Sequence, residues 1–432
     1  MNYTKKLKTF TILALFLFQF ASTSFAQTTK FSEPRQEKLL NGLKLLTWNE
    51  PNADKITIKL RIHSGSAFDP QGKEGVMALL ADALFPNESQ REFFAEDLGG
   101  SLDVTSNFDY IQINATGKSD QFLTMMETLA TAVTNPQFDK EITAKVVAAR
   151  LEKVKELEKN PSYIADQAVA KRLFGDFPYG RAQMGTNISL AKIDFADLLF
   201  AKQRFLTADN ATLAVIGKVK SEFAYSVVRR YFGGWEKADK KVPATFRQPD
   251  APDTKQIIVN SPLIENSEIR YAMRGLARND KDFASSSILI KIMQNRLSKK
   301  FPQENKNNFF VRQNSNLLPG LITVGISNLS LDGKPSSDMI AFRGENLPAI
   351  LVTEKISIEE FEKAKNEAAT EMNQKNLADL WLDVDTFKLN TAKAEFQKIN
   401  DVSIADVQKI AERLTKEPTA TVLIVKSKEE KK

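Results

Sequence analysis

Residues that can carry out chemistry are scarce in this sequence. The 432-residue chain has no cysteine and one histidine, His63. Cysteine nucleophiles, disulfides and thiolate metal sites are therefore excluded, and so is any zinc site that needs two imidazoles. A Ser-His-Asp triad would have to use His63. That residue lies opposite Ile58, Leu60 and Ile62 on a predicted strand. We interpret it as an exposed or hydrogen-bonded strand residue.

The elements that would position such residues alternate between strands and helices. In the segment 55–63, Ile56, Ile58, Leu60 and Ile62 recur at every second position, which predicts a strand with one buried face. Apolar residues recur at helical spacing in 138–159, and Asn160-Pro161 is expected to end that helix. Further strands are predicted at 44–48, 101–106, 110–116 and 212–216, and further helices at 75–85, 120–134 and 194–205.

The pattern occurs twice along the chain. The segment 195–216 resembles 404–425 at an offset of 209 residues, and 55–70 resembles 267–282 at an offset close to 212. A repeat of this length indicates a duplicated domain. The region between the copies, 236–256, is rich in Lys, Asp and Pro, as linkers are. We therefore predict a two-domain α/β protein, with domains at 27–235 and 257–432.

The first 26 residues have the features of a signal peptide. Lys5, Lys6 and Lys8 precede an apolar run at 10–20, and Ser24-Phe25-Ala26 predicts cleavage before Gln27. An uncleaved anchor is the alternative. Losing three lysines from a net charge of +6 leaves +3, which gives no reason to expect a nucleic acid partner. No later stretch has the length of a membrane span. We expect an exported, periplasmic protein without an integral membrane span.

Several motifs, taken in order, resemble one enzyme family. They are Ser64-Gly-Ser-Ala-Phe-Asp-Pro70 before the apolar helix 75–85, Leu98-Gly-Gly-Ser-Leu-Asp-Val-Thr-Ser106, Phe177-Pro-Tyr-Gly180, and 205–217 with its final glycine. Together they resemble the pitrilysin/insulinase-type zinc metallopeptidases over essentially the whole mature chain. The resemblance implies two homologous α+β sandwich domains, each a mostly antiparallel sheet packed with helices. It also implies an inverted zinc motif, His-x-x-Glu-His, on the helix 75–85.

The metal-binding residues of that family are missing here. Ala78 and Asp82 occupy the positions that the resemblance assigns to the two histidines, and Ala81 occupies that of the catalytic Glu. The third ligand position corresponds to about Lys153, next to Glu152. One carboxylate cannot hold catalytic zinc, which needs three protein ligands. We expect no metal and no cofactor, and we interpret Asp82 as a solvated or hydrogen-bonded helix residue.

Two further sites follow from the resemblance. An Arg and a Tyr of the second half that assist substrate correspond to Pro302 and Phe309, with Arg312 nearby. Substrate peptide adds to a sheet edge, here the predicted strand Ser101, Leu102, Asp103, Val104, Thr105 and Ser106. A backbone edge needs no particular side chain, so peptide binding can outlast catalysis; the alternative is that the edge is covered.

The resemblance also implies a partner, since half-length members pair to enclose a chamber. We expect a catalytically inactive homologue, the non-catalytic subunit of an exported heterodimeric zinc peptidase, which holds peptide substrate for a catalytic pitrilysin-type chain. Two alternatives remain open. One is a stand-alone peptide-binding or scaffold protein, and the other is an active metalloendopeptidase with an unorthodox site.

Overall fold

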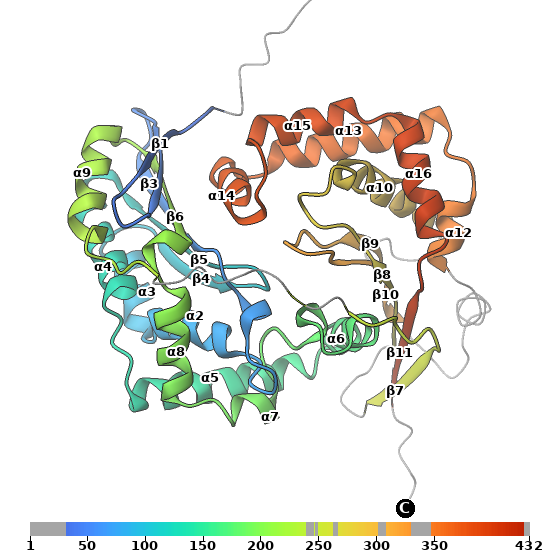
Figure 1. Cartoon of the computed structure of the whole chain (residues 1–432), viewed down its shortest axis with the longest axis horizontal. Helices are drawn as coiled ribbons and strands as arrows, with labels where there is room; N and C mark the ends of the chain where they lie inside the picture. The colour runs from blue at the N-terminus through green and yellow to red at the C-terminus, as the bar shows by residue number, and fades with distance from the viewer. Residues whose placement is uncertain are drawn as a thin grey trace, which may run out of the picture. The chain divides into compact units, whose positions relative to one another are not determined.

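The computed structural model describes residues 32–238, 246, 249–261, 267–300, 308–329 and 347–426. Residues 33–432 form one compact unit that contains two β-sheets (Figure 1). The predicted signal peptide at 1–26 and Pro302 lie outside the described residues, as does most of 239–248.

The first sheet has six strands in the order β1-β2-β6-β3-β5-β4, with β2 and β6 parallel and all other neighbours antiparallel. The strands are β1 (Arg35–Lys38), β2 (Lys44–Asn49), β3 (Lys55–Ile62), β4 (Ser101–Ser106), β5 (Ile111–Lys118) and β6 (Ala211–Gly217). The predicted strands agree with these bounds to within two residues.

Helices pack on one face of this sheet because that face is apolar. Ile56, Ile58, Leu60 and Ile62 of β3 are fully buried in one hydrophobic cluster with residues of the covering helices. The helices of this half are α2 (Val76–Leu84), α3 (Glu88–Glu96), α4 (Phe122–Thr134), α5 (Lys140–Leu157), α6 (Pro161–Phe174), α7 (Asn187–Leu190), α8 (Phe195–Phe205) and α9 (Ser221–Phe232). Short 3₁₀ turns lie at Ser66–Phe68, Ser119–Gln121, Pro178–Gly180 and Ala208–Asn210.

The second sheet repeats the order of the first from β2 onward, as β7-β11-β8-β10-β9. Its one parallel pair, β7 and β11, corresponds to β2 and β6. The elements of this half are β7 (Ile257–Ser261), β8 (Ser267–Arg274), α10 (Phe283–Lys300), β9 (Phe309–Gln313), β10 (Leu321–Leu329), α12 (Leu347–Thr353), α13 (Ile358–Gln374), α14 (Leu377–Phe387), α15 (Ala392–Asp401), α16 (Ile404–Leu414) and β11 (Ala420–Lys426). The predicted two-domain α/β fold is confirmed, whereas the domain boundaries remain predictions.

Each half lends one helix to the sheet of the other half. Helix α6 packs on β8 and β11, and α14 packs on β6. An ion pair marks both crossings: Arg61 of β3 bonds Asp383 of α14 at 2.7 Å, and Arg270 of β8 bonds Asp166 of α6 at 2.8 Å. Both arginines are 1% exposed. The two halves are therefore joined by buried polar contacts as well as by the chain itself.

Within the described residues, no helix combines the length and apolar character needed to cross a bilayer.

Candidate functional site

The helix α2, which carries the predicted metal-ligand positions, begins at a buried acidic cap. The Asp69 carboxylate accepts hydrogen bonds from the Gly75 amide at 2.7 Å and from the Met77 amide at 2.8 Å. Burial raises the pKa of Asp69 to about 7, against the opposing effect of these two hydrogen bonds. Gly75 has φ of 103°, and a Cβ there would approach Leu190 Cδ2 to 2.8 Å. The start of α2 therefore depends on a glycine and on a side-chain cap.

A guanidinium joins the two positions that the resemblance assigns to histidines. Arg150 of α5 donates from Nε and from Nη2 to Asp82 Oδ2, at 2.8 and 2.5 Å. Its Nη2 also donates to the carbonyl oxygen of Ala78 at 3.2 Å, and its Nη1 lies 3.4 Å from Sδ of Met184. Arg150 is only 4% exposed. One cationic side chain thus spans Ala78 and Asp82 and ties α2 to α5.

These residues do not fit a zinc ion. Ala78 and Ala81 are buried methyl groups, and the single carboxylate, Asp82, is already paired with a cation. The guanidinium of Arg150 would repel a metal at this place. Across the part of the chain that the structure describes, no three His, Cys, Asp or Glu side chains are grouped closely enough to hold a metal.

The predicted third ligand position, Lys153, lies on the exposed side of α5. It lines the same pocket as Asp82 and Arg150. Its neighbour Glu152 is also exposed and is paired with Lys155 at 2.7 Å. The sequence analysis did not identify Arg150 as part of the site. A signal was present, because Arg150 lies four residues after Val146 and four before Val154, in the buried stripe of the helix.

The predicted peptide-binding strand lies at the edge of the first sheet. In the order of strands, β4 is terminal and pairs only with β5. The Asn107 amide donates to the Tyr110 carbonyl at 2.9 Å and closes the hairpin. Because antiparallel pairing alternates, the main-chain groups of Leu102, Val104 and Ser106 point away from β5.

This edge is open over its central part. The Ser106 carbonyl accepts a hydrogen bond from the side chain of Gln183 at 2.6 Å. In the described residues, no hydrogen bond reaches the outward main-chain groups of Leu102 and Val104. Helix α2 packs against β4, so the open edge runs beside the helix that carries Ala78 and Asp82.

The corresponding edge of the second sheet is covered. Gln294 of α10 accepts from the Val311 amide at 2.7 Å and donates to the Phe309 carbonyl at 3.3 Å, so its amide occupies the outward groups of β9. Phe309, the predicted Tyr position, is 5% exposed. Arg312 is ion-paired with Asp166 of α6 at 2.5 Å. Of these two corresponding edges, β9 has its outward groups occupied by Gln294, whereas those of Leu102 and Val104 in β4 have no hydrogen bond among the described residues.

His63 is a structural residue. Its Nδ1 lies 3.0 Å from the Thr386 hydroxyl of α14, and its Nε2 lies 2.9 Å from the Thr212 hydroxyl of β6. Burial, with smaller effects from Lys388, Arg61 and Lys44, lowers the pKa of His63 to about 3. The imidazole is therefore neutral at physiological pH. Both ring nitrogens have hydrogen-bond partners, so His63 is the hydrogen-bonded strand residue that was one of the two interpretations from the sequence.

The turn Phe177–Gly180, one of the motifs that carry the resemblance, also joins the halves. The Tyr179 hydroxyl donates to Asp109 at 2.7 Å. The same carboxylate accepts from the side-chain amide of Asn316 at 2.9 Å and from the main-chain N–H of Leu317 at 3.2 Å. Tyr179 is 1% exposed. This motif holds the first half against the second and offers no reactive group.

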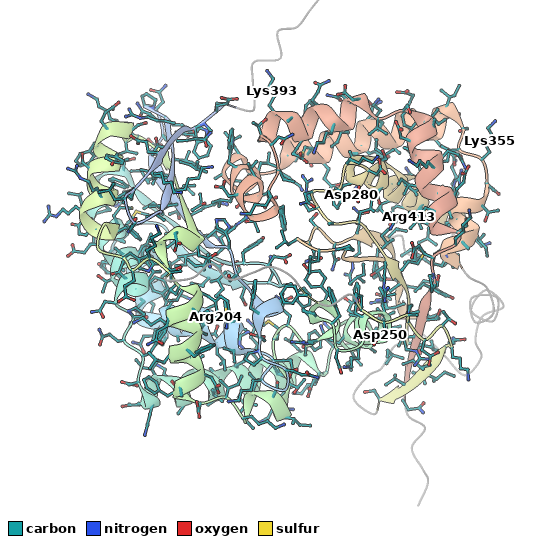
Figure 2. The ribbon with its side chains drawn as sticks, in the orientation of Figure 1. Arg204, Asp250, Asp280, Lys355, Lys393 and Arg413 are labelled. Carbon is teal, nitrogen blue, oxygen red and sulfur yellow. The ribbon has the colours of Figure 1, made fainter. Side chains whose placement is uncertain are left out.

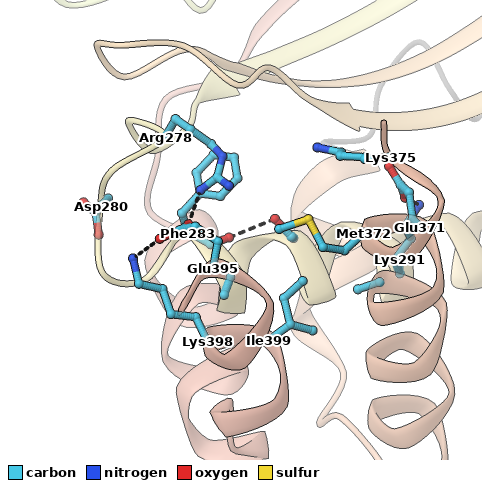
Figure 3. Close-up of a pocket in the computed structure, with 13 residues that line it drawn as sticks. Arg278, Asp280, Phe283, Lys291, Glu371, Met372, Lys375, Glu395, Lys398 and Ile399 are labelled. Atoms are coloured by element: carbon cyan, nitrogen blue, oxygen red, sulfur yellow. Dashed lines mark hydrogen bonds and ion pairs between the residues drawn. The ribbon is translucent and has the colours of Figure 1, made fainter. Parts of the chain in front are cut away.

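A pocket of the second half lies between α10, α13 and α15 (Figure 3). Its cations are largely neutralised within the pocket: Glu395 pairs with Arg278 at 2.7 Å and with Lys398 at 2.6 Å, and Glu371 pairs with Lys291. Asp280, labelled in Figure 2, lies in the loop before α10. Three of the cations are thus paired within the pocket, whereas Lys375 and Asp280 line it without an ion pair among the described residues.

Two family models match this chain in sequence order. Residues 44–187 match insulinase (peptidase family M16), and residues 192–367 match the peptidase M16 inactive domain. An uncharacterized zinc protease of Rickettsia bellii is 24% identical over 208 residues, which are 47% of this chain and 50% of that protein. The probable mitochondrial-processing peptidase subunit beta of Arabidopsis thaliana is 23% identical over 244 residues, 55% of this chain and 44% of that protein. The chain spans about half the length of the curated relatives that it matches.

Solved structures with this fold cover nearly the whole chain. A peptidase M16 inactive domain from Pseudomonas fluorescens superposes with a TM-score of 0.80 at 17% identity, covering 92% of this chain and 98% of that chain. The periplasmic protease PqqL of Escherichia coli superposes with a TM-score of 0.71 at 15% identity, covering 92% of this chain and 48% of PqqL. Together with the two family models, this shared fold confirms the predicted resemblance, and the chain belongs to the insulinase family of peptidases, family M16.

Proposed function

We propose that this protein has no hydrolytic activity of its own and is the non-catalytic, peptide-holding subunit of an exported two-chain zinc peptidase. One observation carries the proposal: the Arg150 guanidinium bridges Asp82 and the Ala78 carbonyl where relatives would need metal ligands. A guanidinium has no vacant coordination position, so it cannot bind and acidify water as a metal does. At the position of the general base, Ala81 has a methyl group that cannot accept a proton.

The open edge of β4 supports a role in holding peptide. An extended peptide can pair with the outward main-chain groups of Leu102 and Val104, which have no hydrogen-bond partner among the described residues. The equivalent edge, β9, is covered by Gln294. Main-chain pairing favours no particular side chain, so this edge would serve a range of peptides.

The length of the chain supports a partner. The superposition covers 92% of this chain and 48% of PqqL, which is described as a periplasmic protease, so the fold described here corresponds to about half of that protein and leaves room for a second half of similar size. The Arabidopsis relative is named as a subunit. In the proposed assembly the second chain carries an intact His-x-x-Glu-His, and the features of residues 1–26 direct this chain to the periplasm.

A stand-alone peptide-binding protein is the second candidate. It is favoured by the same observation on β4, because the open edge belongs to this chain and needs no partner to exist. The two candidates differ in whether peptide cleavage depends on this chain.

The first experiment tests for the partner and for activity. Affinity purification of the chain from its native host should recover a similar-sized protein with an intact His-x-x-Glu-His. That protein should cleave a quenched fluorescent peptide much faster when this chain is added, and a chelator should abolish cleavage. Recovery of a monomer or homodimer alone would contradict the subunit role. Chelator-sensitive cleavage by this chain alone would contradict its inactivity.

The second experiment tests peptide capture at the edge. Val104→Pro removes one outward N–H without removing a hydrogen bond to β5, a position at which an edge strand tolerates proline. We expect this variant to lose peptide binding, measured by fluorescence anisotropy, while keeping its far-UV circular dichroism. Thr105→Ala, which alters a side chain of the same strand and no main-chain donor, is the matched control. Equal binding by both variants would exclude β4 as the peptide site.

A further inference from the structure

A basic pocket lies between the end of α2 and the exposed side of α5. Its lining combines apolar side chains such as Phe85 with six charged side chains, namely Asp82, Glu88, Arg91, Lys145, Arg150 and Lys153. Four of these side chains are cationic and two are anionic. The pocket therefore has an excess of two positive charges, in a protein whose mature net charge is predicted to be only +3.

Two of the cations have no acidic partner among the described residues. Lys145 donates to the neutral side-chain oxygen of Asn87 at 2.6 Å, and no contact with a carboxylate is present for Lys153. The acids of the pocket are engaged elsewhere, because Asp82 pairs with Arg150 and Glu88 contacts Arg91 at 3.4 Å. Two lysine ammonium groups are thus free to bind an anion.

A pocket of the second half provides a comparison. Between α10, α13 and α15, Arg278, Lys291 and Lys398 are each paired with a glutamate of the same pocket (Figure 3). Lys375 also lines that pocket and contacts no carboxylate among the described residues, so one lysine is unpaired there and two are unpaired in the pocket beside α2.

The basic pocket and β4 both adjoin α2, which would place the pocket near side chains that a captured peptide directs toward the helices. Helix α2 packs against both β4 and α5. Leu102 and Val104 direct their side chains toward the helical core. In a strand added to β4, the residues beside these two positions would point to the same face, because neighbouring strands share their pleat.

We propose that this pocket binds a carboxylate of the peptide held along β4, so that the protein selects acidic peptides. The inference rests on the proposed function and adds the chemical class of the substrate. The carboxylate comes either from an Asp or Glu side chain or from the C-terminus of the peptide, since Lys145 and Lys153 would recognise both.

The test compares peptides of one sequence that differ only in charge. Fluorescence anisotropy at low salt would measure binding of a neutral peptide, of versions with one internal Asp or Lys, and of versions with a free or an amidated C-terminus. We expect the acidic versions to bind about tenfold more tightly than the neutral one, with a preference that falls as salt is added. The internal Asp and free C-terminus versions show which carboxylate is bound.

Two double variants locate the preference. Lys145→Gln with Lys153→Gln should abolish it. The matched control, Lys155→Gln with Lys159→Gln, removes the same charge from the end of α5 and the turn that follows it, at residues that pair with Glu152 and Glu156, and should retain it. Equal loss in both variants would overturn the inference, because the preference would then reflect overall charge.

The outcomes separate this inference from the proposed function. If all peptides bind alike and Val104→Pro abolishes binding, peptide capture stands and the carboxylate site is wrong. If no peptide binds, both are wrong.

Discussion

We interpret Arg150 as a link between helices α2 and α5 at the place where the resemblance assigns a metal. Its guanidinium is always charged and donates in fixed directions, which suits the Asp82 carboxylate and the Ala78 carbonyl together. A metal would also join α2 to α5, through its protein ligands. It would in addition keep an empty coordination position that can take up water. In the proposed function, the arginine keeps the link between the helices without the reactivity of a metal.

Removing this side chain should be costly. Arg150→Met leaves Asp82 and the Ala78 carbonyl without their partner, so we expect a loss of about 2–3 kcal/mol in the free energy of unfolding, reduced from that of a fully buried pair because Asp82 is partly exposed. Urea unfolding followed by circular dichroism measures it. Lys153→Met, on the exposed side of the same helix, should change stability by less than about 0.5 kcal/mol. Similar losses in the two variants would show that the guanidinium does not hold the helices together.

His63 should make stability depend on pH. Its pKa is about 3 in the folded protein and about 6.5 in an unfolded chain, so between these values the unfolded state binds the extra proton. The contribution of the neutral imidazole is complete above pH 6.5 and is lost as the pH falls toward 3, at up to about 1.4 kcal/mol per pH unit. The unfolding free energy of the protein should therefore fall relative to that of His63→Gln between pH 7 and pH 4, by up to about 1.4 kcal/mol for each pH unit below 6.5. A difference that does not change with pH would contradict the buried, neutral state of His63.

At the scale of elements, local patterns predicted what local physics determines. Strands β3, β4 and β6 and helices α2, α5 and α8 begin and end within about two residues of the predicted positions, because alternation and helical spacing are properties of the segment itself. The pattern could not show that Asp379 and Asp383 of α14 face Lys59 and Arg61 across the molecule. On a helix, such acids are typical of a solvated face. Arg150 was missed for a related reason, since an arginine within an apolar stripe has a partner only in the folded chain.

The sequence repeat predicts where the strands lie but not which of their faces is buried in which core. Strands β6 and β11 start 209 residues apart, as the sequence repeat predicts. In the first half, however, Ala211 and Leu213 belong to the core under the helices, whereas Ala420 and Val422 pack against α6. One residue of shift exchanges the two faces of a strand. Residues of β6 and β11 that are 209 positions apart thus lie on opposite faces of their sheets. The offset between structurally equivalent residues of these strands therefore differs from 209 by an odd number, which sequence similarity alone does not reveal.

We expect the helix pair α2 and α5 to hold a metal once the guanidinium is removed and ligands are restored. Ala78→His with Asp82→His puts two imidazoles on one face of α2, but Arg150 would still occupy the space and repel a cation. We therefore expect no stoichiometric zinc in this double variant. Adding Arg150→Glu supplies a third ligand from α5 and should give about one zinc per chain.

Elemental analysis of the dialysed, folded variants measures this difference. His63→Gln can be included in both to exclude a contribution from the native histidine. Stoichiometric zinc in the variant that retains Arg150 would show that the guanidinium does not stand at the metal position.

At the scale of the whole molecule, the crossed helices make the two halves depend on each other. The crossing of α14 is mainly ionic, with Lys44, Lys59 and Arg61 of the first sheet paired to Asp385, Asp379 and Asp383. The crossing of α6 is mainly apolar, with Ala165 and Val169 in one cluster with Val422 and Ile424. Neither sheet is covered on both faces by its own half.

We therefore expect one unfolding transition for both halves. Asp383→Asn leaves the buried Arg61 without a full counter-charge at one crossing, and we expect it to lower stability by about 2–3 kcal/mol while the transition stays single. Urea unfolding followed by circular dichroism and by tryptophan fluorescence should give coincident curves from the two probes, for the protein and for the variant. The reason is that loss of α14 from the first sheet disrupts both halves at once. Asp406→Asn, in an exposed cap of α16 remote from both crossings, should lower stability by no more than about 1 kcal/mol. Two separate transitions in Asp383→Asn, with only one of them shifted, would mean that each half folds without the helix that the other lends to it.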